Sequence, residues 1–289
     1  MSESSREPII DAHTHIFPPE IINGRASFLT RDLWFEQLYT NPEALLIGSN
    51  DLVQSMDRAG IDCSIACGFP WRDPGLCRLH NDFMAEASAA TGRRIHWLGI
   101  VSPTAGIEAV KEAQRCFSLG AAGVGELNAD AQLFDVTDSN LLKDLYELCS
   151  QNNRAVMLHA SEPVGHTYPG KGASTPDRLL KMIEGFPEVE FVLAHWGGGL
   201  PFFELMPEVA ATTVRVTYDT AASTYLYRPQ IFRSVLDIVG PERVLFASDY
   251  PILRQDRFIA KARSVSWRGD EERRAVLCEN ARRVYRLER

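Results

Sequence analysis

The sequence predicts an α/β protein that folds as a (β/α)8 barrel. Eight short runs rich in Val, Ile, Leu, Phe and Ala recur along the 289 residues, and segments of helical character separate them. Runs that are apolar almost throughout are typical of parallel strands covered on both faces. Alternating strands and helices favour right-handed crossovers, and eight such units close naturally into a barrel of this length.

The predicted strands share this apolar character and stop at a turn or at a polar residue. They span Pro8–Phe17, Cys63–Phe69, Ile95–Pro103, Ala121–Asn128, Ala155–Glu162, Glu190–Gly197, Val214–Ala221 and Arg243–Pro251. A doubly wound open sheet is the alternative. The G-x-G-x-x-G motif of dinucleotide-binding sheets is absent after the first strand, which counts against it.

The segments between the strands carry helix signals. Asp51–Gly60 and Asn81–Gly92 both end in glycine, which favours a helix C-cap. The other predicted helices span Gly106–Gly120, Thr137–Asn153, Thr175–Pro187, Pro201–Ala211, Pro229–Gly240 and Gly269–Glu288. The segment 18–50 is too long for a simple connection and carries Phe28, Trp34, Phe35 and Tyr39. We therefore expect a single domain, 1–289, with 18–50 inserted over the barrel mouth.

The composition excludes several classes of protein. The formal net charge is −8 and the isoelectric point is near 5.4, which disfavours a nucleic-acid binder because phosphate recognition needs a basic face. No apolar run approaches the roughly 20 residues that cross a bilayer, and the polar opening MSESSREP lacks the apolar stretch of a secretory signal. The six cysteines are scattered, which predicts free thiols in a reducing compartment. We expect a cytoplasmic protein that acts on a small molecule.

Polar side chains stand at one end of the predicted strands, where barrel enzymes build their sites. They are His13 and His15 on the first strand, Glu126 on the fourth, His159 on the fifth, His195 on the sixth and Asp249 on the eighth. Imidazoles and carboxylates converging at one opening form a ligand set for one or two divalent cations, most simply Zn²⁺. His80 and His96 lie away from these strand ends and are read as structural residues.

Five short segments carry a resemblance to a known family: DAHTHIF, LHAS, LAHWGG, FASDYP and the C-terminal ENARRVYRL. Together they resemble the amidohydrolase superfamily, and most closely its branch related to aminocarboxymuconate-semialdehyde decarboxylase. The resemblance extends over nearly the whole chain. It implies that His13, His15 and His159 ligate a metal ion and that Asp249 ligates the ion or faces its bound water.

The same resemblance gives His195 one of two roles, as a ligand of a second ion or as the group that polarises the substrate. Asp249 and His195 are therefore the expected catalytic residues. Glu126 departs from the decarboxylase-like pattern and is similar to the acidic bridge of binuclear phosphotriesterase-like relatives. The alternative for Glu126 is that it orients a ligand histidine from outside the coordination sphere.

Loops beside these strand ends supply candidate substrate-binding residues. The loop 160–174 carries His166, Tyr168 and Lys171, which are suited to gripping an anionic or carbonyl group. Arg72 follows the second strand and is suited to a bidentate contact with a carboxylate. Trp196 directly follows His195. Each of these residues has a surface or packing role as its alternative.

The function predicted first is hydrolysis of a C–O or C–N bond in a small molecule by metal-activated water. The alternative within catalysis is a non-oxidative decarboxylase or hydratase of a carboxylated small molecule, which an arginine in the pocket would favour. The alternative of another class is a non-catalytic, metal-stabilised binding protein. Ligands placed at an open barrel mouth count against it, since structural zinc sites are closed. Barrels of this kind often form homodimers.

Overall fold

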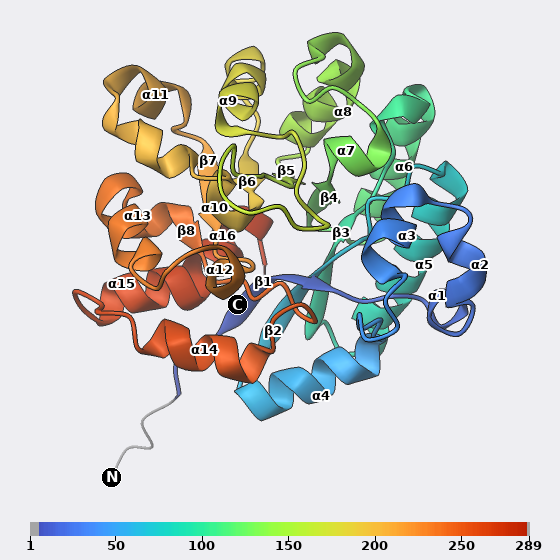
Figure 1. Cartoon of the computed structure of the whole chain (residues 1–289), viewed down its shortest axis with the longest axis horizontal. Helices are drawn as coiled ribbons and strands as arrows, with labels where there is room; N and C mark the ends of the chain where they lie inside the picture. The colour runs from blue at the N-terminus through green and yellow to red at the C-terminus, as the bar shows by residue number, and fades with distance from the viewer. Residues whose placement is uncertain (1–5, 288–289) are drawn as a thin grey trace.

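Eight parallel strands form one sheet in the order β1 to β8, and Figure 1 shows them ringed by helices. The computed structural model describes residues 6–287, so most of the polar N-terminal opening lies outside it. The strands are β1 (Ile10–His15), β2 (Cys63–Cys67), β3 (Ile95–Gly99), β4 (Gly123–Leu127), β5 (Ala155–Leu158), β6 (Phe191–Leu193), β7 (Val216–Asp219) and β8 (Val244–Leu245). Each lies inside one of the predicted runs.

The sheet closes where the segment after β8 meets β1. The amide of Ala12 donates to the carbonyl of Phe246 at 2.9 Å, and the amide of Asp249 donates to the carbonyl of His13 at 3.0 Å. A single parallel bridge joins Thr14 to Tyr250. These contacts confirm the predicted barrel and exclude the open sheet.

The outer helices follow the strands in turn. The longer ones are α4 (Ser49–Ala59), α5 (Pro74–Ala90), α6 (Ile107–Ser118), α8 (Ser139–Gln151), α9 (Pro176–Gly185), α13 (Ile231–Val239) and α14 (Gln255–Arg263). The shorter ones are α1 (Pro19–Asn23), α2 (Arg25–Leu29), α3 (Leu33–Tyr39), α7 (Ala129–Gln132), α10 (Ala194–Gly197), α11 (Pro207–Thr212), α12 (Ser223–Leu226), α15 (Asp270–Arg274) and α16 (Asn280–Tyr285). Short 3-10 segments occupy Pro103–Ala105, Leu200–Leu205 and Pro241–Arg243, and a π-helical turn, Ala275–Glu279, joins α15 to α16.

Two predicted helices have other bounds in the structure, and one of the longer helices was not predicted. Helix α5 begins at Pro74 rather than Asn81, because the Asp73 side chain accepts from the amides of Gly75 and Leu76 and caps the helix there. The predicted helix Pro201–Ala211 is broken before Pro207 into a 3-10 segment and α11. Helix α14 was not predicted, since few of its residues are apolar.

The C-terminal helix closes one end of the barrel. Ala281, Val284 and Tyr285 of α16 are buried in the same apolar cluster as Ile10 and Ala155, the first residues of β1 and β5. The helix therefore covers the amino ends of the strands. The carboxyl ends, where the predicted ligands stand, remain open to a pocket.

Aromatic side chains from the insertion and from the segments that follow β1 and β2 form a cluster at the open end. This aromatic wall consists of Phe17, Phe35, Tyr39, Phe69 and Trp71, with ring centroids 4.5 Å apart for Phe69 and Trp71 and 5.1 Å apart for Phe35 and Trp71. His80 of α5 lies against the wall. It accepts from the Trp71 indole N–H at 3.0 Å and donates to the carbonyl of Ile16 at 2.6 Å. Its structural role was predicted correctly.

The remaining whole-chain features are simple. Within residues 6–287, no helix has both the length and the apolar character needed to cross a membrane. All six cysteines are free, as their scattered positions predicted. The homodimer stays a prediction.

Candidate metal centre

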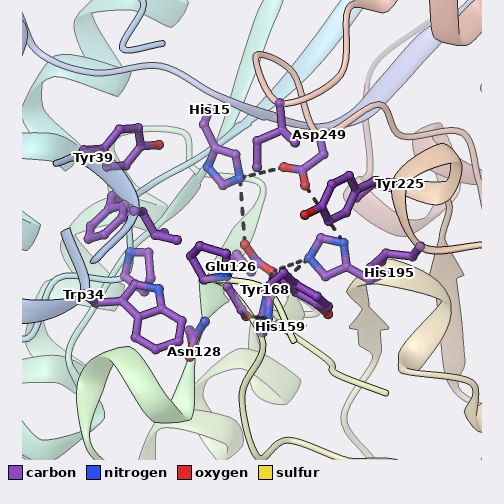
Figure 2. A pocket seen from close by; sticks show the side chains of 18 residues that line it. His15, Trp34, Tyr39, Glu126, Asn128, His159, Tyr168, His195, Tyr225 and Asp249 are labelled. Atoms are coloured by element: carbon purple, nitrogen blue, oxygen red, sulfur yellow. Dashed lines mark hydrogen bonds and ion pairs between the residues drawn. The ribbon is translucent and has the colours of Figure 1, made fainter. Parts of the chain in front are cut away.

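The barrel brings the six predicted side chains together at the carboxyl ends of its strands. Two groups of three have ligand atoms that all lie within 4.8 Å of one another. One group is His13, His15 and Asp249, and the other is Glu126, His159 and His195. Figure 2 shows five of these six side chains turned toward a common centre. These six residues are called the ligand cluster below.

Strand geometry and two unusual backbone positions aim these side chains. His13 and His15 are two residues apart on β1 and face the same way, with their Nε2 atoms 3.0 Å apart. His195 and Asp249 follow β6 and β8 with φ angles of 57° and 64°. Left-handed backbone is uncommon outside glycine and costs free energy, so its use at two cluster residues points to a functional constraint.

Each imidazole is held by its outward nitrogen. His13 Nδ1 donates to Asp219 Oδ2 at 2.8 Å, and His159 Nε2 donates to the carbonyl of Gly170 at 2.9 Å. The Nδ1 atoms of His15 and His195 lie 3.3 Å from the carbonyls of Cys67 and Ala221. An imidazole that donates outward presents the lone pair of its other nitrogen inward, which is the arrangement of metal-ligating histidines.

Glu126 lies between the two groups. Its Oε1 is 2.9 Å from His159 Nδ1 and 3.5 Å from His195 Nε2. Its Oε2 is 3.4 Å from His13 Nε2 and 3.8 Å from His15 Nε2. One carboxylate therefore faces both groups, one oxygen to each.

The chemistry of the cluster fits a divalent cation. Asp249 Oδ1 is buried and makes no well-aligned hydrogen bond, although His15 Nε2 lies 3.2 Å away. A buried carboxylate oxygen without a partner is costly unless a cation satisfies it. Four inward lone pairs and two carboxylates supply the nitrogen and oxygen ligands that zinc and manganese accept.

Without a cation, the cluster shifts the pKa values of its own members. Burial opposes ionisation of Asp249, but the imidazoles of His15, His13 and His195 outweigh it and lower its pKa to about 2. Burial likewise opposes charging of His195, yet Glu126, Asp249 and Asp219 raise its pKa to about 9. Protons on the imidazoles partly replace the missing positive charge, so cation binding must displace them.

A pocket of about 250 Å³ opens onto the ligand cluster. Its walls are mostly aromatic or apolar and come from the insertion, the loop after β5 and helix α12. The residues outside the cluster that line it are Trp34, Leu38, Tyr39, Phe69, Pro70, Asn128, Tyr168, Pro169, Gly170, Ala222, Tyr225, Leu226 and Ile252. The volume suits one small ring.

Of the five predicted substrate-binding residues, only Tyr168 lines this pocket, and its hydroxyl donates to Glu162 at 2.9 Å. Arg72 is exposed because its neighbour Trp71 takes the inward position. His166 is exposed at the loop tip, beside Tyr168 and Tyr225.

Two further predicted substrate-binding residues, Lys171 and Trp196, make their hydrogen bonds to other parts of the protein. The Lys171 ammonium donates to the carbonyls of Val164 and His166 and so holds its own loop. Trp196 is fully buried, and its indole N–H donates to Ser223 at 2.6 Å. Arg72, His166, Lys171 and Trp196 are therefore corrected as residues outside the pocket.

Two further polar residues end strands, and both lie outside the predicted ligand set. Asp219 is the last residue of β7, and its Oδ1 accepts from the amides of His195 and Ala221 while Oδ2 holds His13. Asn128 follows β4 and lines the pocket. Sequence reasoning missed Asn128 as a site residue, and its position at a polar strand end, like those of the ligand cluster, was the signal that could have found it.

Several solved structures share this fold. The 5-carboxyvanillate decarboxylase of Sphingomonas paucimobilis matches with a TM-score of 0.82 and 19% identity, over 98% of this chain and 100% of its own. The 2,6-dihydroxybenzoate decarboxylase of Rhizobium matches with a TM-score of 0.75 and 18% identity, over 97% and 99%. A dihydroxybenzoic acid decarboxylase of Polaromonas sp. JS666, solved with bound manganese and 2-nitroresorcinol, matches with a TM-score of 0.76 and 19% identity, over 98% of each chain.

At these identities the likeness establishes the fold. The family follows from the sequence itself, because the family profile described as Amidohydrolase matches residues 10–287. The predicted resemblance is thereby confirmed over nearly all of the chain, although zinc as the bound metal stays a prediction. This chain, with its barrel and its cluster of metal-binding side chains, belongs to the amidohydrolase family.

Proposed function

We propose that this chain is a metal-dependent, non-oxidative decarboxylase of a small aromatic monocarboxylic acid. The observation that carries the proposal is the pocket, whose walls are aromatic and whose polar end is the ligand cluster. Among residues 6–287, no lysine or arginine lines it. A flat ring therefore finds stacking partners on the walls, and a carboxylate finds positive charge only at the cluster.

The fold comparisons support the same chemistry. Three matching structures are decarboxylases of ring-bearing carboxylic acids, and each covers at least 97% of this chain. This evidence favours the alternative function predicted from the sequence over the hydrolysis predicted first. The arginine expected in a decarboxylase pocket is absent, so the bound cation would carry that role.

His13, His15 and Asp249, which form one group of the ligand cluster, would hold the cation, and the family resemblance adds His159 from the other group. When bound, it supplies the positive charge that holds substrate oxygens and offsets developing negative charge. Decarboxylation breaks the bond between the ring carbon and the carboxylate, releases carbon dioxide and leaves the ring carbon to take up one proton. His195 and Asp249 both line the pocket, so these two side chains can hold that proton and deliver it to the ring carbon.

The test is a screen of the manganese- and zinc-loaded protein against benzoates and heteroaromatic monocarboxylates. We expect carbon dioxide and the decarboxylated ring in equal amounts, with the activity lost in Asp249→Asn. Phenyl esters, anilides and aryl phosphates serve as the comparison set. Turnover of that set without any decarboxylation would contradict the proposal.

Hydrolysis stays as a second candidate because of Glu126. Its carboxylate faces both groups of the ligand cluster, as a bridge between two cations would. Two-cation sites commonly serve hydrolysis. A count of bound ions by elemental analysis separates the candidates, since about two per chain, reduced to one in Glu126→Gln, would favour hydrolysis.

A further inference from the structure

Asn128 lines the pocket, and hydrogen bonds fix the orientation of its side chain. It follows β4 and is only 3% exposed. Its Oδ1 accepts from the amides of Asp130 and Ala131 at 3.0 and 3.1 Å, which caps helix α7. An amide group has one oxygen and one nitrogen, so this cap decides which way the side chain presents each of them.

The backbone of Asn128 is fixed as well. Its amide donates to Gln132 Oε1 at 3.2 Å. Gln132 is fully buried, and its Nε2 donates to the carbonyls of Trp71 and Val101 at 3.1 and 2.7 Å. Turning the Asn128 amide over would break both cap bonds, so the orientation is set before any ligand enters the pocket.

The capped oxygen leaves the Asn128 nitrogen for the pocket. Figure 2 shows this nitrogen turned toward the labelled pocket residues and the oxygen turned away. Nδ2 donates to no other residue in the described range 6–287. The nitrogen borders the pocket, so an oxygen acceptor on a bound molecule can reach it and become its hydrogen-bond partner.

The other polar groups of the wall are less available as donors. The Tyr168 hydroxyl donates to Glu162, and His159 Nε2 donates to Gly170. Tyr225 is 53% exposed at the mouth of the pocket. The Tyr39 hydroxyl is the remaining candidate, and it sits on the insertion rather than on a strand end.

We propose that Asn128 selects the substrate: it donates a hydrogen bond to an oxygen acceptor that the aromatic acid carries in addition to its carboxylate. This inference rests on the proposed function for the aromatic acid, and it adds which ring substituent the pocket recognises. The predicted substrate class is thus an aromatic monocarboxylate with a hydroxyl, alkoxy or carbonyl oxygen on the ring. Sites that donate to a substrate oxygen discriminate against analogues that lack it.

The experiment compares ligands of the same shape that differ in one acceptor. Equilibrium binding to the manganese-loaded protein is measured for 2-, 3- and 4-methoxybenzoate and for the corresponding ethylbenzoates. We expect the methoxy compound to bind about fivefold more tightly than its ethyl counterpart at one ring position, the gain of a single neutral hydrogen bond.

Two variants keep the cap and change the donor. Serine and aspartate both cap helices well, so Asn128→Ser and Asn128→Asp should retain the melting temperature of the native chain within a few degrees. Asn128→Ser should reduce the methoxy preference to less than about twofold. Asn128→Asp, which offers an acceptor in place of the donor, should reverse it.

Four outcomes would overturn the inference: no preference at any ring position in the native chain, a preference that survives Asn128→Ser, a preference lost in Tyr39→Phe instead, or no saturable binding by any ring compound. Binding is measured without turnover, so the proposed function is judged separately. A methoxy preference without release of carbon dioxide would contradict the proposed decarboxylase activity alone. Decarboxylation without the preference would contradict only the role of Asn128.

Discussion

His195 and His80 are both buried histidines near the open end of the barrel, and their surroundings push them in opposite directions. Burial disfavours the charged form of each. At His195, three carboxylates outweigh burial and raise its pKa to about 9. At His80, the neighbours are the aromatic wall and neutral hydrogen-bond partners, and burial lowers its pKa to about 4.

The opposite pKa shifts distinguish a histidine in a cation-binding site from a histidine that packs as a neutral ring. Carboxylates around His195 attract positive charge, whether from protons or from a metal ion. His80 must be uncharged, because its Nδ1 accepts from the Trp71 indole while its Nε2 donates to Ile16. A single residue type thus serves binding on one side of the pocket and packing on the other.

Removing a ligand should give the largest effect. In His159→Ala, we expect metal affinity to fall more than about 100-fold, because a direct ligand is lost rather than an orienting partner. The barrel should stay folded, since His159 follows β5 and does not pack in the core. Elemental analysis measures the bound metal, and circular dichroism measures whether the barrel is folded.

The matched control for that variant is His166→Ala, which changes an exposed histidine of the next loop. It should retain the metal content of the native chain. Stoichiometric metal in His159→Ala would remove His159 from the ligand cluster.

The aromatic wall should respond to pH through His80. Its pKa lies below the value of 6.5 for a free histidine, so the unfolded chain binds the proton first and folding is favoured above that pH. Between pH 6.5 and pH 4, His80 should cost the folded state roughly 3 kcal/mol, from about 1.4 kcal/mol per pKa unit.

The measurement is the difference in free energy of unfolding between the native chain and His80→Gln at each pH. The difference is needed because Asp11 acts in the opposite sense: burial raises its pKa to about 6, so acid stabilises the fold there. A difference that stays constant from pH 7 to pH 4 would contradict a neutral His80.

Changing the orienting carboxylate should give the smallest of these effects. Asp219→Asn removes the charge and one of the two acceptor oxygens, so the side chain can no longer accept from His13 and from the amides of His195 and Ala221 together. We expect metal affinity to fall 10- to 100-fold. Competition with a chelator measures this loss. Affinity unchanged within about twofold would show that Asp219 acts on the fold alone.

The barrel and the six cluster residues could be predicted because both depend on local sequence. Apolar runs mark strands, parallel strands align their carboxyl ends, and a polar residue at the end of such a run must stand at that rim. That rule placed His159 and Asp249 in one cluster although 90 positions of chain separate them. The helix α14 could not be predicted in this way, because its apolar pattern is weak.

The pocket walls depended on contacts between residues distant in sequence. Arg72 faces solvent because Trp71 packs against Phe28 and Phe35 of the insertion. Asn128 presents its nitrogen to the pocket because α7 takes its oxygen and because Trp71 and Val101 hold Gln132. The sequence by itself determined that ligands converge at the carboxyl end of a barrel. Only the tertiary structure decided which rim residues face inward, because packing and capping between separate segments set the direction of each side chain.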